Sequence, residues 1–70
     1  MRIITEKGLE RNIGQEAHLG LEGVGVSGFL LKDDNGIYVG VSRGGVKYYV
    51  EDGEPIIIKK RVYEINLRES

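Results

Sequence analysis

The chain has 70 residues and no cysteine, and its ten basic and eleven acidic side chains give a net charge of −1. This length supports one domain, residues 1–70, with a small core. The lack of cysteine excludes disulfides and cysteine-ligated zinc or iron–sulfur sites, and the balanced charge gives no overall attraction to phosphate. No apolar run reaches the roughly 20 residues of a membrane span, and no signal-peptide core opens the chain, so we expect a cytoplasmic protein without a membrane partner.

The N-terminal residues allow two alternative elements. Thr5 can cap a short helix that runs to Arg11, with Ile4 and Leu9 in contact across the cap. A short edge strand over residues 2–5 is the competing assignment.

The middle of the chain predicts two strands and then a tight hairpin. Residues 16–21 alternate apolar and polar side chains, which predicts a strand that turns at Glu22-Gly23. Residues 24–31 and 37–42 alternate in the same way around Asn35-Gly36, a pair that tolerates the positive φ of a hairpin turn. Glycines inside these runs allow strong bending of the strands.

Three more strands are expected in the last third of the chain, at residues 46–50, 56–60 and 62–67. In the first of them, alternation places Val46, Tyr48 and Val50 toward the core, with Lys47 and Tyr49 outward. The apolar phase then changes between residues 58 and 63, which predicts a bend or bulge at residues 59–61.

Together these elements predict an all-β fold. We expect a small, strongly bent antiparallel barrel of about five or six strands, SH3-like or Sm-like, with or without a short N-terminal helix.

Two stretches resemble the motifs of Sm-like (LSm) proteins. The first is Gly28, Leu30 and Asp34 with the apolar pair Val39 and Val41. The second is made of Ile57, Ile58, Lys59, Lys60, Val62 and Ile65. The resemblance implies a helix before a bent barrel and RNA binding by a ring of subunits. The chain differs from the family at Tyr38, where a base-contacting Asn would stand, and at Lys59-Lys60-Arg61, which replaces an Arg-Gly turn.

Two other motifs suggest ligands but lack the required context. Residues 23–28 spell G-x-G-x-x-G, yet no helix follows to receive a pyrophosphate, so the glycines indicate strand bending. Asp33-Asp34-Asn35-Gly36 lacks the ligand pattern of a calcium loop and indicates a hairpin turn with solvated carboxylates. We therefore expect no metal site and no cofactor.

His18 is the only histidine. A catalytic role would need a nucleophile and an orienting carboxylate, for which Ser27, Ser42 and Glu16 are the candidates. One strand histidine does not make a catalytic constellation, so no catalytic residue is predicted. A small hydrolase centred on His18 is kept as a distant alternative.

The predicted binding surface consists of tyrosines and cations on outward positions and turns. Its members are Tyr38, Arg43, Lys47, Tyr49, Lys59, Lys60 and Arg61. Tyrosines stack on bases and cations hold phosphates, while tyrosine and arginine also anchor protein interfaces. A solvated sheet face, with lysine stems over tyrosine rings, is the third interpretation.

The predicted function is that of a non-enzymatic protein-interaction module. We expect a small accessory or adaptor protein, of bacterial or phage type, that contacts another protein or itself through an exposed edge strand or apolar patch. The alternative is an Sm-like RNA-binding ring, which the net charge disfavours.

Overall fold

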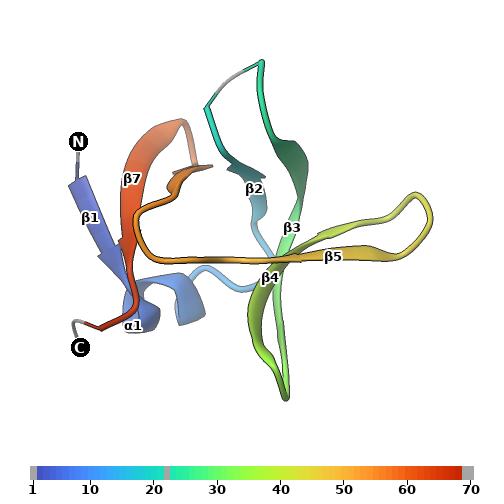
Figure 1. Cartoon of the computed structure of the whole chain (residues 1–70), viewed down its shortest axis with the longest axis horizontal. Coiled ribbons are helices and arrows are strands. Elements are labelled where there is room, and N and C mark those ends of the chain that lie inside the picture. Colours follow the sequence, from blue (N-terminus) through green and yellow to red (C-terminus); the bar gives the residue numbers. More distant parts are fainter. Residues whose placement is uncertain (1, 22, 69–70) are drawn as a thin grey trace.

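The computed structural model describes residues 2–21 and 23–68, so Glu22 of the predicted turn lies outside the described part. Within those residues the chain forms seven strands and one short helix. In chain order these are β1 (Arg2–Thr5), α1 (Glu6–Glu10), β2 (Glu16–Leu19), β3 (Val26–Asp33), β4 (Gly36–Val41), β5 (Val46–Tyr49), β6 (Pro55–Ile58) and β7 (Arg61–Asn66) (Figure 1). The all-β class is therefore confirmed.

The strands form one sheet in the order β1-β7-β6-β2-β3-β4-β5. Among the described residues this sheet is open, with β1 and β5 at its two edges, and it is mixed because β1 runs parallel to β7. The expected sheet was fully antiparallel with about five or six strands. The additional strand is β1, which the sequence predicts only as an alternative to the helix.

Both N-terminal alternatives occur, one after the other. Thr5 is the last residue of β1 and also the N-cap of α1, where its hydroxyl accepts a hydrogen bond from the Gly8 amide at 3.2 Å. Ile4 and Leu9, the expected apolar pair beside the cap, are both buried. The helix is one residue shorter than predicted and ends at Glu10, with Arg11 as its C-cap.

The core lies on the inner face of the bent sheet. It is formed by the buried residues Ile4, Leu9, Ala17, Leu19, Leu30, Ile37, Val39, Val50, Ile56, Ile58 and Ile65. The sheet can bend because β3 and β4 approach closely at Gly28, where an added Cβ would lie 2.2 Å from the Gly40 carbonyl oxygen. This approach explains one of the strand glycines without a ligand.

The first tight turn differs from the prediction. Asp33 pairs with Gly36, so the two connecting residues are Asp34 and Asn35, one position earlier than expected. Of these four residues only Gly36 has a positive φ, at 127°. The Asn35 amide instead donates to the Asp33 carboxylate at 2.8 Å, and this side-chain turn stabilises the bend without a left-handed asparagine.

At residues 59–61, where a bend or bulge was predicted, the chain makes a second tight hairpin turn and not a bulge. Ile58 pairs with Arg61, and Lys59 and Lys60 connect them with φ values of 52° and 66°. Such left-handed pairs are typical of type I′ turns and usually contain asparagine or glycine. Because two residues connect the strands, the buried side chains have even residue numbers in β6 and an odd number in β7. This shift accounts for the phase change in the sequence.

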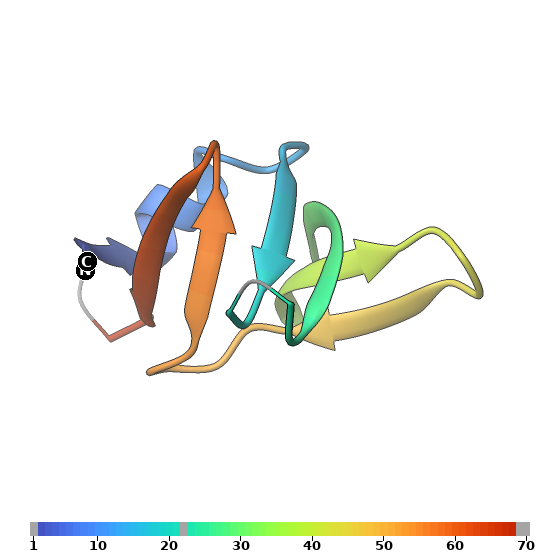
Figure 2. The ribbon, with the colours of Figure 1, turned by 90° about the horizontal axis from the view of Figure 1, so that it is seen from above.

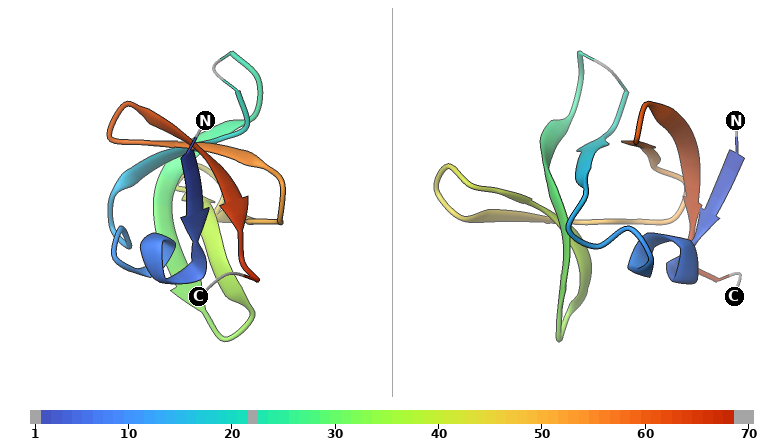
Figure 3. Two further views of the ribbon diagram at one scale, coloured as in Figure 1. Left: turned by 90° about the vertical axis from the view of Figure 1, so that its left-hand side faces the viewer. Right: turned by 180° about the vertical axis from the view of Figure 1, so that it is seen from behind.

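The β4–β5 hairpin extends away from the rest of the molecule. Figures 2 and 3 show it at the opposite end from β1 and α1, where it extends beyond β3. Among the described residues, no helix is long and apolar enough to cross a bilayer.

Candidate interaction surface

The edge strand β5 is exposed along its whole length. Val46 and Tyr48, which were predicted to face the core, have 45% and 41% of their surface accessible, and Tyr49 has 37%. Only Val50, just after the strand, is buried as expected. The prediction for Val46 and Tyr48 is wrong because the β4–β5 hairpin extends past the rest of the sheet, and among the described elements none lies over its outer part (Figure 2).

On the other side of the hairpin, the strand pairing brings together three of the predicted binding residues. Tyr38 of β4 lies opposite Tyr49 of β5, and their ring centroids are 5.4 Å apart with the planes tilted by 55°. The Lys47 ammonium lies 4.9 Å from the centre of the Tyr38 ring, close enough for a cation–π interaction.

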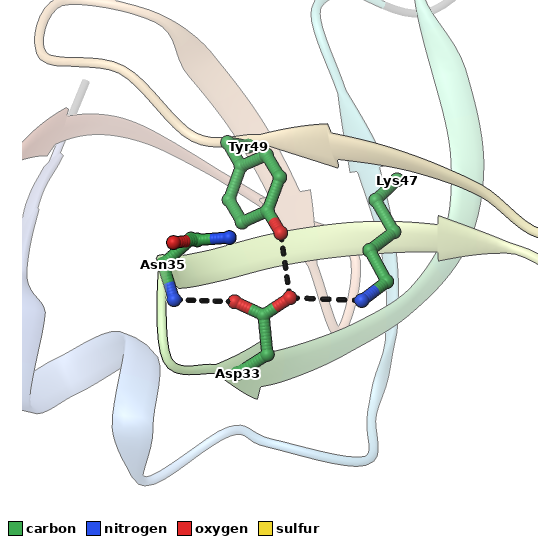
Figure 4. Close-up of polar contacts among 4 residues, drawn as sticks. All are labelled: Asp33, Asn35, Lys47 and Tyr49. Carbon is green, nitrogen blue, oxygen red and sulfur yellow. Dashed lines mark hydrogen bonds and ion pairs between the residues drawn. The ribbon is translucent and has the colours of Figure 1, made fainter.

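Asp33, at the end of β3, organises this cluster (Figure 4). Its Oδ2 accepts hydrogen bonds from the Lys47 ammonium at 2.9 Å and from the Tyr49 hydroxyl at 2.5 Å. Its Oδ1 accepts the Asn35 amide already described. One carboxylate at the end of β3 therefore links the turn before β4 with two residues of β5. We call Asp33, Tyr38, Lys47 and Tyr49 the Asp33 cluster.

The hydrogen bonds change the acid–base behaviour of the Asp33 cluster. Hydrogen bonds from Lys47 and then Tyr49 lower the pKa of Asp33 from 3.8 to about 2. The same bonds to Asp33 raise the pKa of Lys47 and that of Tyr49. Near neutral pH the Asp33 carboxylate and the Lys47 ammonium are thus both charged, and because they are paired their charges cancel locally.

The remaining predicted site residues do not join this cluster. Arg43 lies in the turn between β4 and β5, at the tip of the same hairpin. Lys59, Lys60 and Arg61 lie at the β6–β7 turn, on different elements of the sheet. The structure therefore divides the seven predicted residues into two groups.

Sequence reasoning missed two residues of this surface. The sequence pattern indicates a solvated turn carboxylate at Asp33 and a core position for Tyr48. One sequence signal could have indicated the role of Asp33. It ends a strand just before a hairpin, and the strand after that hairpin contains a lysine and tyrosines. The exposure of Tyr48 had no local signal, because the alternation in β5 is the same as in a buried strand.

His18 makes contacts that fix a loop. Its Nε2 lies 2.7 Å from the Val24 carbonyl oxygen and 3.0 Å from that of Leu21. Because carbonyls only accept, Nε2 carries a hydrogen and donates to both. Its Nδ1 lies 2.6 Å from the hydroxyl of Ser27, which faces it from the neighbouring strand. The ring thereby ties together the connection between β2 and β3.

The pair of Ser27 and His18 resembles part of a hydrolytic site, and it borders a shallow depression of about 380 Å³ that also includes Glu16, Lys59 and Lys60. Among the described residues, however, no carboxylate hydrogen-bonds to His18. Within the same residues, no group of three or more His, Asp or Glu side chains is placed to hold a metal ion. The His18 ring thus contacts two carbonyl groups of the loop and one hydroxyl of β3.

Comparisons with models of known protein families, with curated proteins and with solved structures found no match to this chain.

Proposed function

We propose that the protein is a non-enzymatic interaction module, a small accessory or adaptor protein, that binds other protein chains and itself through the β4–β5 hairpin. One observation carries the proposal. Every residue of β5 is exposed, although the strand contains Val46, Tyr48 and Tyr49 and lies at the edge of the sheet. An edge strand with unpaired backbone groups and exposed apolar side chains is a template for adding another strand.

The composition of the hairpin supports a protein partner over a nucleic acid. Tyrosine is enriched at protein interfaces, and a tyrosine held in one orientation loses little entropy on binding. Tyr38 and Tyr49 are held in this way by their contact with each other and by the Tyr49–Asp33 hydrogen bond. Lys47 is already paired with Asp33, so its charge is less available to a phosphate.

We further propose that the underlying fold is a small SH3-like or Sm-like barrel with two added strands. A helix, α1, precedes the five strands from β2 to β6, and β6 returns to pair with β2, which curls this part of the sheet. β7 and β1 then extend the sheet beyond β6.

The RNA-binding alternative has one supporting observation. Lys59, Lys60 and Arg61 are consecutive, exposed, and free of salt bridges within the described part of the chain. A gel shift with short RNA at several salt concentrations tests it. Salt-dependent binding that is lost on combining Lys59→Ala with Arg61→Ala would favour this alternative.

Sedimentation velocity over a range of protein concentrations tests the interaction module. The wild-type protein should associate as its concentration rises, and combining Val46→Thr with Tyr48→Thr should keep it monomeric. Ile3→Thr with Val62→Thr is the matched control, because these residues are also exposed but lie on β1 and β7. Self-association is contradicted if the wild type stays monomeric, and the hairpin is the wrong surface if only the control pair prevents association.

A further inference from the structure

We infer that β5 pairs with β5 of a second copy, antiparallel and two-fold symmetric, with Tyr48 on the symmetry axis. This inference rests on the proposed function and specifies the partner and the register. It follows from which backbone groups of β5 are free, from the position of its one charge, and from the side chains that each register would bring together.

The direction of the backbone groups along β5 is set by its pairing with β4. The Val50 amide donates to the Ile37 carbonyl at 3.0 Å, and the register places these two residues opposite each other. In an antiparallel ladder, alternate residues of a strand turn their N–H and C=O toward the same neighbour. The backbone N–H and C=O groups of Tyr48 and Val46 therefore point to β4, while those of Lys47 and Tyr49 point to the free edge.

A second β5 can satisfy these groups in few registers. The two-fold axis is perpendicular to the sheet and must set one residue opposite the same residue of the other copy; we name each register by that residue. If instead the axis set a residue opposite the next residue in the sequence, a free amide would face a group already bonded to β4. An axis through Lys47 would place Tyr49 opposite Gly45 of the other copy, whose positive φ of 65° is not the extended backbone that a strand partner needs. An axis through Tyr49 would leave most of the strand without a partner, because β5 ends there.

An axis through Tyr48 avoids both problems. Lys47 of each copy then lies opposite Tyr49 of the other in a hydrogen-bonded pair, so the free N–H and C=O groups of both residues are satisfied. The two Tyr48 side chains meet as a non-hydrogen-bonded pair, in which side chains approach most closely. Val46 of each copy comes next to Val50 of the other, and its exposed surface is covered.

The charge at this edge does not oppose the pairing. Lysine on an edge strand commonly prevents two edges from joining. Here the Lys47 ammonium is 2.9 Å from the Asp33 carboxylate and lies over the Tyr38 ring, so its charge is neutralised within its own subunit. The pairing uses the same strand of both copies, and this closes the assembly at two subunits on this edge.

Single cysteines test the register cleanly, because the chain has no natural cysteine. Tyr48→Cys should form a disulfide-linked dimer on mild oxidation, because non-hydrogen-bonded partners have Cα atoms about 4.5 Å apart, within disulfide range. Lys47→Cys and Tyr49→Cys should each fail alone, because identical residues would then be diagonal neighbours about 7 Å or more apart. A mixture of these two variants should cross-link.

Proline provides a second test that does not depend on oxidation. Lys47→Pro removes an amide that points to the free edge and leaves the ladder to β4 intact, so it should weaken dimerisation about tenfold or more. Lys47→Ala, which keeps the amide, is the control for loss of the side chain and should dimerise far better. Circular dichroism of each variant establishes that it is folded.

The outcomes separate this inference from the proposed function. Cross-linking through Lys47→Cys alone, or a dimer that is unchanged in Lys47→Pro, overturns the register while leaving the hairpin as a binding surface. If combining Val46→Thr with Tyr48→Thr leaves association unchanged, both proposals are overturned.

Discussion

Two strands of the sheet, the central strand β6 and the edge strand β5, bury their apolar side chains to different extents. In β6, alternate residues are fully or almost fully buried, with Ile56 at 0% and Ile58 at 2% accessible. In β5 the corresponding alternate residues, Val46 and Tyr48, are exposed. The difference is that β6 lies in the middle of the sheet, over the core that α1 and the neighbouring strands complete, whereas β5 extends past it. Alternation thus indicates which side chains can be buried together, and a second layer decides whether they are.

The largest expected effect separates these two regions directly. Ile56→Ala should lower the free energy of unfolding by about 2–5 kcal/mol, because it leaves a cavity in the core. Tyr48→Ala should lower it by about 1 kcal/mol or less, because Tyr48 is already 41% accessible and lies outside the core. Urea unfolding at low protein concentration measures both. A comparable loss in the two variants would mean that the hairpin packs against a core.

A second prediction concerns the bend that joins the two regions. Gly28→Ala should destabilise the protein by about 1–3 kcal/mol, because its Cβ would collide with a backbone carbonyl that cannot move aside. Gly40→Ala is the control. Its Cβ would meet only the ends of the Leu31 and Tyr38 side chains, at 3.2 Å, so the loss should be smaller. Equal losses measured by urea unfolding would contradict this account of the bend.

The β6–β7 turn of the core region offers a gain in stability. Lys59→Asn with Lys60→Gly should raise the free energy of unfolding by about 1–2 kcal/mol, because left-handed backbone is costly for lysine. For a chain of this length, each kcal/mol of added stability raises the melting temperature by about 4–8 °C. Asn35→Gly is the control at the hairpin turn, where the asparagine is not left-handed and no such gain is expected. Thermal unfolding followed by circular dichroism gives both values.

The smallest effect lies in the hairpin region and depends on pH. The pKa of Asp33 is lower in the folded protein, about 2, than its ordinary 3.8. The hydrogen bonds to the ionised Asp33 carboxylate therefore stabilise the folded state above pH 3.8, and this contribution is lost as the pH falls toward 2. Asp33→Asn should remove this acid-dependent component of the free energy of unfolding between about pH 5 and pH 2.

Asp34→Asn provides the comparison, because Asp34 has no polar side-chain partner within the described residues. It should retain the wild-type dependence on pH. If both variants show the same slope as the wild type, the Asp33 cluster does not contribute to stability.

The sequence predicted much of the local structure and part of the site. The approximate positions of β2 to β7, the Thr5 cap and the outward placement of Lys47 and Tyr49 follow from alternation and capping rules. The strand expected at residues 24–31 lies two residues later, at Val26–Asp33. The link between Asp33 and Tyr49 was not predictable in the same way, because it depends on how β3, β4 and β5 align across two turns.

What the sequence by itself determined is therefore the set of elements, because backbone preferences and side-chain alternation act over a few neighbouring residues. Only the tertiary structure decided that Val46 and Tyr48 lie in solvent, that Lys59 and Lys60 adopt left-handed backbone, and that β1 joins β7 in parallel. Each of these depends on contacts between residues far apart in the chain, such as the core that ends before β5. The stability gained from those distant contacts outweighs local preference.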